Sequence, residues 1–194
     1  YFRIQKKSGA FRLFKQGNDT NMEAGDCWQL SCIPADFTTP NWAKGATIYQ
    51  IFPDRFNRTR PPFMTRDDIY LHEKWDEPPL ALFDPLNGDT HSRDFFGGNL
   101  QGIIEKLDYL KSLHITVIYL NPIFLARSNH RYDTGDYMQV DPMLGTEEDF
   151  RELCIHAHKF GIKIILDGEE EIGSKGLADF AAKNKELLKA DMVY

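Results

Sequence analysis

The stretch Thr116-Val117-Ile118-Tyr119-Leu120, followed directly by Asn121-Pro122, decides the fold class of this 194-residue chain. A short apolar run bounded by turn residues is typical of a strand buried on both faces. Similar runs occupy residues 47–52 and 162–166, and residues 192–194 would begin a fourth. The chain therefore repeats a buried strand at intervals long enough to hold a helix between one strand and the next.

Amphipathic segments separate these strands. Helices are predicted over residues 100–113, from a capping box at residues 146–149 to Gly161, and over residues 176–188. Their apolar faces are Leu100, Ile103, Ile104, Leu107 and Leu110, then Phe150, Leu153, Cys154 and Ala157, and finally Leu177, Phe180, Ala181 and Leu188. Strands alternating with such helices predict a parallel sheet, either doubly wound or part of a (β/α)₈ barrel.

Loop lengths distinguish these two folds only in part. The connections that follow helices are very short, whereas those that follow strands, residues 53–99 and 121–145, are long. Both folds bind ligands at the carboxyl ends of their strands. Neither G-x-G-x-x-G nor G-x-x-x-x-G-K-[ST] occurs, so the pattern favours the barrel.

The N-terminal part follows a different pattern. Residues 2–14 alternate as a β-hairpin, a short strand is predicted over residues 27–33, and the Pro-containing residues 34–42 are typical of a linker. We expect a domain boundary near Asn41. The predicted parts are residues 1–40, residues 41–167, and residues 168–194 as an acidic turn and helix.

Composition excludes several classes of partner. The 23 Lys and Arg residues stand against 29 Asp and Glu residues, a net charge of −6, with no long basic run, so neither nucleic acid nor an anionic membrane is an expected partner. No apolar stretch has the length of a membrane helix. The odd set Cys27, Cys32 and Cys154 favours a reducing compartment, and with no visible signal peptide we expect a cytoplasmic protein.

Four ordered motifs carry a family resemblance. They are Ala46-Thr47-Ile48-Tyr49-Gln50-Ile51-Phe52-Pro53-Asp54-Arg55-Phe56, Phe96-Gly97-Gly98-Asn99-Leu100-Gln101-Gly102-Ile103, Ile118-Tyr119-Leu120-Asn121-Pro122-Ile123-Phe124 and Ser128-Asn129-His130-Arg131-Tyr132-Asp133-Thr134-Gly135-Asp136-Tyr137. Together they resemble family 13 glycoside hydrolases, the α-amylase group, with neopullulanase and cyclomaltodextrinase nearest. The resemblance implies an α/β fold: the first three or so β/α units of a (β/α)₈ TIM barrel, preceded by the end of a β-sandwich domain.

The same resemblance implies an activity and a site. It implies retaining hydrolysis or transfer of α-glucosidic bonds in an α-glucan or a maltooligosaccharide. Tyr132 would stack on the substrate sugar, with His130 and Asp133 beside it. Asp167 belongs to the same substrate-binding set, and Asn121 either contacts substrate or, as we favour, braces the loop. The alternative for the loop is a packed turn capped by Asp133.

The chain also departs from the family. The nucleophile, the general acid and the third carboxylate of the family follow its fourth, fifth and seventh strands, so we expect no catalytic residue and no glycosidase activity in this chain alone. The substrate-binding Asn and His after the third strand are replaced by Glu171 and Ile172. Asn99 stands where calcium-binding relatives have Asp, and with residues 57–60 reading Asn-Arg-Thr-Arg we expect neither calcium nor any other cofactor.

A second resemblance begins at residue 168. Residues 168–174, Gly-Glu-Glu-Glu-Ile-Gly-Ser, resemble the acetylornithine deacetylase and succinyl-diaminopimelate desuccinylase group of di-zinc amidohydrolases. That resemblance would make Glu170 the general base and Glu171 a zinc ligand. No His-x-Asp pair accompanies them, so an exposed acidic turn is the favoured interpretation. A hybrid of two families would explain both resemblances, and a carbohydrate-binding remnant without catalysis, using Trp28 or Tyr132, is a further alternative.

Overall fold

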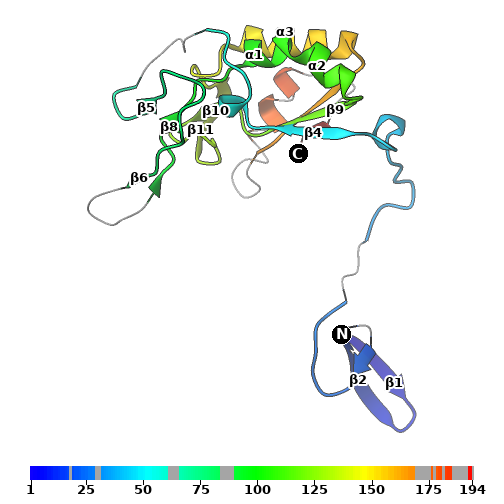
Figure 1. Cartoon of the computed structure of the whole chain (residues 1–194). Coiled ribbons are helices and arrows are strands. Elements are labelled where there is room, and N and C mark those ends of the chain that lie inside the picture. Colours follow the sequence, from blue (N-terminus) through cyan, green and yellow to red (C-terminus); the bar gives the residue numbers. More distant parts are fainter. Residues whose placement is uncertain are drawn as a thin grey trace. The chain divides into compact units, whose positions relative to one another are not determined.

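A computed structural model describes residues 1–17, 19–28, 32–60, 66–83, 90–168, 176, 178–180, 182–184, 192 and 193. It divides the chain into two compact units, Tyr1–Lys44 and Gly45–Tyr194 (Figure 1). The short 3₁₀ turn η1, Asn41–Ala43, lies at the end of the first unit.

The first unit is a three-stranded antiparallel sheet of β1 (Phe2–Lys6), β2 (Gly9–Gln16) and β3 (Asp19–Asn21). Ile4 pairs with Phe11, which confirms the predicted hairpin. The strand predicted over residues 27–33 is wrong for its described residues, and residues 29–31 lie outside the described part. Pairing stops at a single bridge between Lys15 and Asp26. The ring of Trp28 packs on Phe2 instead, with centroids 5.0 Å apart.

The second unit is built on a four-stranded sheet. Its parallel strands are β4 (Ile48–Ile51), β9 (Val117–Leu120), β12 (Lys163–Leu166) and β13 (Met192–Val193). All lie where the sequence predicted strands. They are neighbours in chain order, because each new strand joins the sheet beside the previous one. A barrel is wound in this way, whereas a doubly wound sheet reverses its order at a switch point.

Helices α1 (Leu100–Glu105), α2 (Leu107–Ser112) and α3 (Glu147–Lys159) cover one face of this sheet (Figure 1). The prediction of one continuous helix over residues 100–113 is wrong at Lys106. Its amide donates to Ile103 three residues back at 3.0 Å, which tightens the chain into a 3₁₀-like turn between α1 and α2. The apolar face predicted for this segment nevertheless lies in the core.

The second half of the helical layer follows the prediction where it is described. Thr146 and Asp149 form the expected capping box, and all four predicted core residues of α3 are fully buried. Beyond β12, residues 176, 178–180, 182 and 183 are helical, and Phe180 packs on Phe124 and Phe150. Leu177, Ala181 and Leu188 lie outside the described residues.

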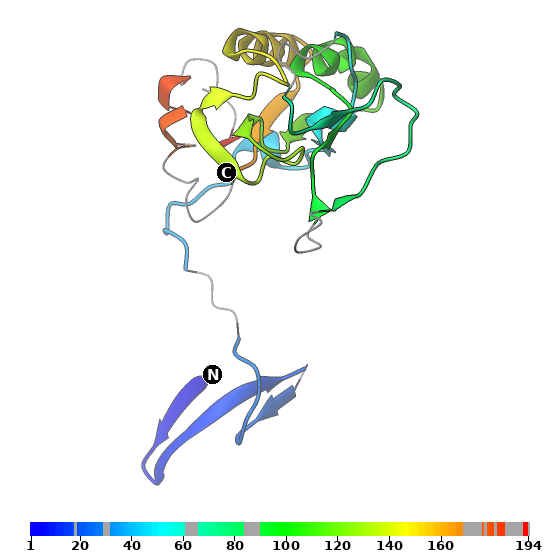
Figure 2. The same ribbon diagram turned by 90° about the vertical axis from the view of Figure 1, so that its left-hand side faces the viewer.

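The two long connections after β4 and β9 contain short elements of their own (Figure 2). The first holds η2 (Pro53–Arg55), β5 (Tyr70–Leu71), β6 (Leu82–Phe83), β7 (Thr90–His91) and β8 (Asp94–Phe95), and the second holds β10 (Phe124–Ala126) and β11 (Thr134–Val140). The strands β10 and β11 form a bulged hairpin, with residues 127–133 as its loop. Within the described part of the chain, no helix is both long and apolar enough to cross a bilayer.

The sheet divides its side chains between two faces. Ile51, Leu120 and Leu166 belong to the core cluster that also contains the apolar residues of α1, α2 and α3. Because side chains alternate along a strand, the residues one position away point to the opposite face. Gln50 and Tyr119 are such residues, and they are direct register partners.

Candidate functional site

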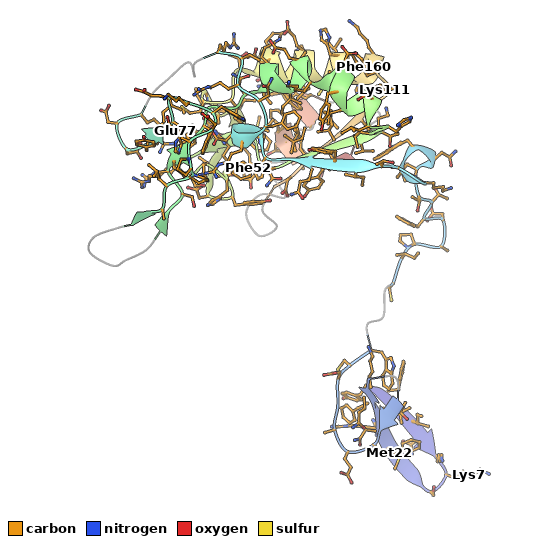
Figure 3. The ribbon with its side chains drawn as sticks, in the orientation of Figure 1. Lys7, Met22, Phe52, Glu77, Lys111 and Phe160 are labelled. Carbon is orange, nitrogen blue, oxygen red and sulfur yellow. The ribbon has the colours of Figure 1, made fainter. Side chains whose placement is uncertain are left out.

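Side chains that follow two strands, β9 and β12, meet at Tyr132. Figure 3 draws the side chains of both units. The Tyr132 hydroxyl donates to Asp167 Oδ2 at 2.5 Å and accepts from Asn121 Nδ2 at 3.3 Å. Gln50 Nε2 in turn donates to Asn121 Oδ1 at 2.8 Å. The structure therefore brings together three residues that the sequence analysis selected, Asn121, Tyr132 and Asp167, and adds Gln50.

The parallel ladder explains why these residues meet. Asn121 and Asp167 come directly after β9 and β12, and their amides continue the ladder. The amide of Asn121 donates to Ile51 O and that of Asp167 to Leu120 O, both at 3.0 Å. Because the strands run parallel and in register, their carboxyl ends lie at one edge of the sheet. The bulged hairpin β10–β11 then places Tyr132 over this edge.

Asp167 affects the pKa values of two tyrosine hydroxyls. Burial, a hydrogen bond to Asp167 and the charge of that carboxylate raise the pKa of Tyr119 to about 12. The same causes, in the same order, raise the pKa of Tyr132, and neighbouring Tyr119 adds to the effect. Both phenols therefore stay protonated at neutral pH. The carboxylate of Asp167 is held in place by the hydrogen bond from Tyr132.

His130 lies beside Tyr132 in the same loop. Their rings stack at a centroid distance of 5.8 Å, and the Tyr132 amide donates to His130 Nδ1 at 3.1 Å. Ser128 Oγ also lies 3.0 Å from His130 Nδ1. The side chain of Tyr132 keeps an open surface, since the residue is 37% exposed. His130 and Tyr132 thus form an aromatic pair with a polar edge.

Asp133 directs its carboxylate to the backbone of its own loop. It accepts from the hydroxyl of Ser128, from the Ser128 amide at 3.2 Å and from the Arg127 amide at 3.3 Å. Burial alone would raise the pKa of Asp133, but these hydrogen bonds outweigh it and lower the pKa. These hydrogen bonds are those of a loop cap, which is the alternative that the sequence analysis left open for this residue.

Arg131 anchors the loop through its buried side chain, and the sequence analysis missed this role. The residue is fully buried and has a left-handed φ of 62°. Its Nε donates to Asp141 Oδ2 at 2.7 Å, and its Nη1 donates to Asn129 O at 2.8 Å. Since an arginine between polar neighbours is usually exposed, the only available signal was the acidic Asp141 ten residues further along.

The turn before α1 is held by a buried acid, Asp54, which belongs to η2. Asp54 accepts from the amides of Phe96 at 2.9 Å and Gly97 at 3.0 Å. Burial raises its pKa, against the lowering effect of Arg131 and Arg55. Asn99 is the N-cap of α1, because its side chain accepts from the Gly102 amide at 2.7 Å. Asp54 and Asn99 therefore hold the first long connection against the start of the helical layer.

The two residues of the zinc hypothesis, Glu170 and Glu171, lie outside the described residues. Across the described ranges, no group of three or more His, Cys, Asp or Glu residues is arranged to hold a metal ion.

The fold and this edge define a class of protein. It is an α/β protein whose parallel strands join the sheet in chain order. Its candidate site is an exposed aromatic ring among polar groups at the carboxyl ends of these strands. The family model "Alpha amylase, catalytic domain" matches residues 50–186. The chain belongs to this family, whose members are glycoside hydrolases of the α-amylase type. The match continues past residue 168, and the comparisons give no support to a hybrid with a di-zinc amidohydrolase.

Individual relatives agree with the family. The chain is 47% identical over 153 residues to an amylopullulanase of Thermoanaerobacterium saccharolyticum, covering 73% of this chain and 12% of the relative. It is 44% identical over 131 residues to neopullulanase 2 of Thermoactinomyces vulgaris, covering 68% and 20%. Among solved structures, the cyclic α-maltosyl-(1→6)-maltose hydrolase of Arthrobacter globiformis, in complex with maltose, superposes with a TM-score of 0.55 at 36% identity, covering 79% and 31%. The chain therefore spans a small part of the length of these relatives.

Proposed function

We propose that this chain contains the part of an α-glucan-active glycoside hydrolase that holds a glucosyl unit of a maltooligosaccharide or α-glucan against Tyr132. One observation carries the proposal: the Tyr132 hydroxyl is bound by Asp167 and Asn121, while the residue stays 37% exposed. A sugar offers a C–H face that packs on an aromatic ring, and its hydroxyls need polar partners at the ring edge. A tyrosine held in one orientation suits this task.

The neighbouring residues receive different roles in this proposal. Asn121 is a bracing residue, because its amide nitrogen donates to Tyr132 and its oxygen accepts from Gln50. His130 offers a ring nitrogen to a sugar hydroxyl beside the Tyr132 ring. Asp133 keeps the loop closed through its bonds to Ser128 and Arg127. Asp167 fixes the Tyr132 ring from the end of β12.

Bond cleavage is proposed to depend on carboxylates other than those described here. Retaining hydrolysis needs two carboxyl groups about 5–5.5 Å apart on either side of the scissile bond. Asp167 already accepts from the Tyr132 hydroxyl. We therefore propose that the 194 residues by themselves bind sugar without hydrolysing it. We also propose that they form part of a (β/α)₈ barrel, preceded by the end of a β-sandwich. The names of the relatives, amylopullulanase and neopullulanase, support the choice of substrate class.

A titration of the chain with maltotriose, followed by amide NMR shifts, tests the binding proposal. We expect shifts at Asn121 and His130, and Tyr132→Ala should weaken this binding roughly five- to thirtyfold, since one stacking contact and its hydroxyl are worth roughly 1–2 kcal/mol. Tyr109→Ala is the matched control, because Tyr109 is a 51% exposed tyrosine on α2. Equal affinity of the Tyr132→Ala chain and the unmodified chain would refute the proposal.

We also propose that the chain needs no calcium at Asn99. The Asn99 Oδ1 accepts from the Gly102 amide at 2.7 Å and from Thr59 Oγ1 at 3.1 Å, so its oxygen already has two donors. We expect EDTA to leave the thermal unfolding midpoint unchanged. A fall of several degrees that added calcium reverses would contradict this.

We also propose a cytoplasmic location, which the free thiols Cys27, Cys32 and Cys154 support. Their rapid oxidation to disulfides in the isolated protein would count against it.

A further inference from the structure

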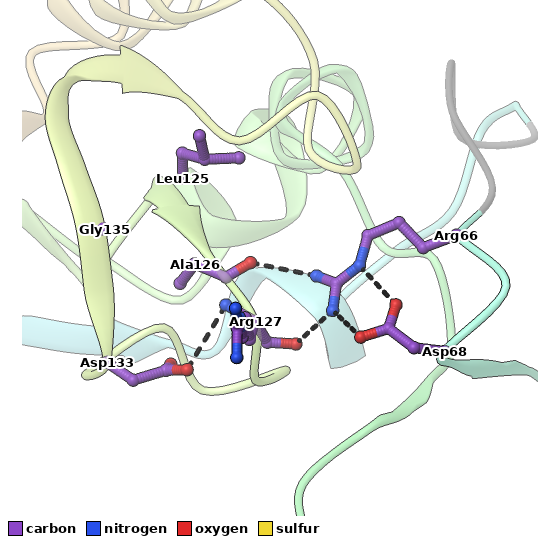
Figure 4. Close-up of a pocket in the computed structure, with 7 residues that line it drawn as sticks. All are labelled: Arg66, Asp68, Leu125, Ala126, Arg127, Asp133 and Gly135. Carbon is purple, nitrogen blue, oxygen red and sulfur yellow. Dashed lines mark hydrogen bonds and ion pairs between the residues drawn. The ribbon is translucent and has the colours of Figure 1, made fainter.

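A pocket of about 400 Å³ lies where the tip of the hairpin β10–β11 meets residues 66–68 of the first long connection (Figure 4). Its volume is within the range of roughly 300–1,000 Å³ that is usual for small-molecule sites. The pocket is lined by residues from both long connections at the carboxyl end of the sheet. The hydrogen bonds that join Tyr132, Asn121 and Asp167 involve none of the residues that line this pocket.

One wall of the pocket is apolar. It is formed by Leu125, Ala126 and Gly135, which come from the paired strands β10 and β11. Gly135 leaves this wall open, because a Cβ atom added there would have its nearest contact, Leu125 O, at 3.6 Å. A flat wall of this kind accepts the C–H face of a ligand.

The opposite wall is charged and rigid. Arg66 Nε and Nη2 each donate to Asp68 at 2.9 Å, and Nη1 and Nη2 donate to the carbonyls of Ala126 at 2.9 Å and Arg127 at 3.0 Å (Figure 4). The guanidinium therefore joins the two connections in one planar arrangement. Because it is already positioned, a ligand would not have to order it on binding.

Charges of both signs line the pocket. They are Arg66 and Arg127 with Asp68 and Asp133, and Arg93 Nη1 lies 3.4 Å from Asp68 Oδ2. Hydrogen bonding to Arg66 lowers the pKa of Asp68, and hydrogen bonds from the loop outweigh burial and lower the pKa of Asp133, so both acids are ionised at neutral pH. Because these opposite charges lie close together, the pocket presents no single sign of charge that would select an ionic ligand. It does offer paired donors and acceptors to the adjacent hydroxyls of a neutral one.

We propose that this pocket is a second sugar site, which binds a neutral hexose unit with its C–H face on Leu125, Ala126 and Gly135 and its hydroxyls toward Arg127, Asp68 and Asp133. The inference rests on the proposed function, because it concerns the same class of ligand. It adds a site that does not include Tyr132. A glucan chain or a free glucose unit could occupy it.

The test is a titration of the whole chain with glucose and with maltotriose, followed by the amide shifts of Ala126 and Gly135. We expect both amides to shift. Gly135→Leu should fill the pocket and weaken the binding seen at Ala126 at least tenfold, whereas Gly135→Ala, which meets no close contact, should preserve it. Arg127→Ala provides a second variant that changes only an exposed side chain in the pocket, and we expect it to weaken binding several-fold.

The outcomes separate this proposal from the proposed function. Shifts at Ala126 and Gly135 that persist in Tyr132→Ala support a separate second site. Shifts confined to Asn121 and His130 overturn the second site and leave the proposed function standing. Loss of all shifts overturns both. Binding of inorganic phosphate at Ala126 and Gly135 in preference to glucose would also overturn the proposal, because the pocket would then select an anion.

Discussion

At the residue scale, the hydroxyls of Tyr119 and Tyr132 make the site sensitive to alkaline pH. Both folded-state pKa values are raised above the usual value near 10, that of Tyr119 to about 12. Between these values the native state binds more protons than the unfolded state, so the stability that these groups contribute is complete below pH about 10 and is lost as the pH rises toward 12.

We therefore expect Tyr119 and Tyr132 to ionise above the usual pKa near 10 in a tyrosinate absorbance titration of the folded chain. Tyr119→Phe should remove one late-ionising group. Asp167→Asn should shift the remaining late titration to lower pH, because it removes the carboxylate that opposes phenolate formation. If the titration of the Asp167→Asn chain is superimposable on that of the unmodified chain, Asp167 is not a cause of the two raised pKa values.

Arg131 provides a second prediction at this scale. Arg131→Met would leave Asp141, which is 2% exposed, without its partner at 2.7 Å. Removing one member of a buried ion pair costs about 3–5 kcal/mol, so we expect a loss of that size in the free energy of unfolding, measured with urea. Arg151→Met is the control, because Arg151 pairs with exposed Glu148 and should cost less than about 1 kcal/mol. Equal losses would contradict the structural role of Arg131.

Which site residues the sequence could predict depends on where they lie. Asn121 and Asp167 directly follow buried strands, so the position of each on the sheet edge follows from the strand assignment alone. Gln50 and Tyr119 lie inside strands, where alternation gives their face but not their partners. The position of Tyr132 depends on a bulged hairpin, and the burial of Arg131 depends on Asp141, so neither contact could be derived from local pattern.

At the element scale, α3 depends on its first turn. Thr146 Oγ1 accepts from the Asp149 amide at 3.1 Å, and Asp149 Oδ2 accepts from the Thr146 amide at 2.8 Å. Thr146→Ala should lower the free energy of unfolding by about 1 kcal/mol, because it leaves an amide without its acceptor. Thr146→Ser keeps the oxygen and should stay within a few tenths of a kcal/mol of the unmodified chain. Urea unfolding of the two variants checks this, and an equal loss in both would argue against the cap.

The elements that were predicted correctly are those with a long or strong pattern. The strands β4, β9 and β12 and the helix α3 are apolar runs or clear amphipathic faces that the core requires. The pairs β5–β8 and β6–β7 have only two residues in each strand, and β10–β11 contains register shifts. Such short or bulged pairs are set by long-range contacts, and they leave no periodicity for sequence analysis to detect.

At the scale of the whole molecule, the sheet ends in an open strand. Among the described strands β4 is at one edge of the order β13-β12-β9-β4, and its first residue, Ile48, is 56% exposed. An edge strand presents unpaired amide and carbonyl groups, and an exposed apolar side chain there favours pairing with another copy. The 194-residue chain should therefore associate as its concentration rises.

Light scattering in line with size-exclusion chromatography measures this association directly. We expect the apparent mass to exceed that of one chain at high concentration. Ile48→Lys should reduce the association, because a charge on an edge strand opposes strand pairing. Ile155→Lys is the matched control: Ile155 is 42% exposed on α3, away from the edge, and carries the same change of charge. If both lysine variants reduce association equally, net charge explains it; only a selective effect of Ile48→Lys identifies the edge of β4 as the surface through which copies pair.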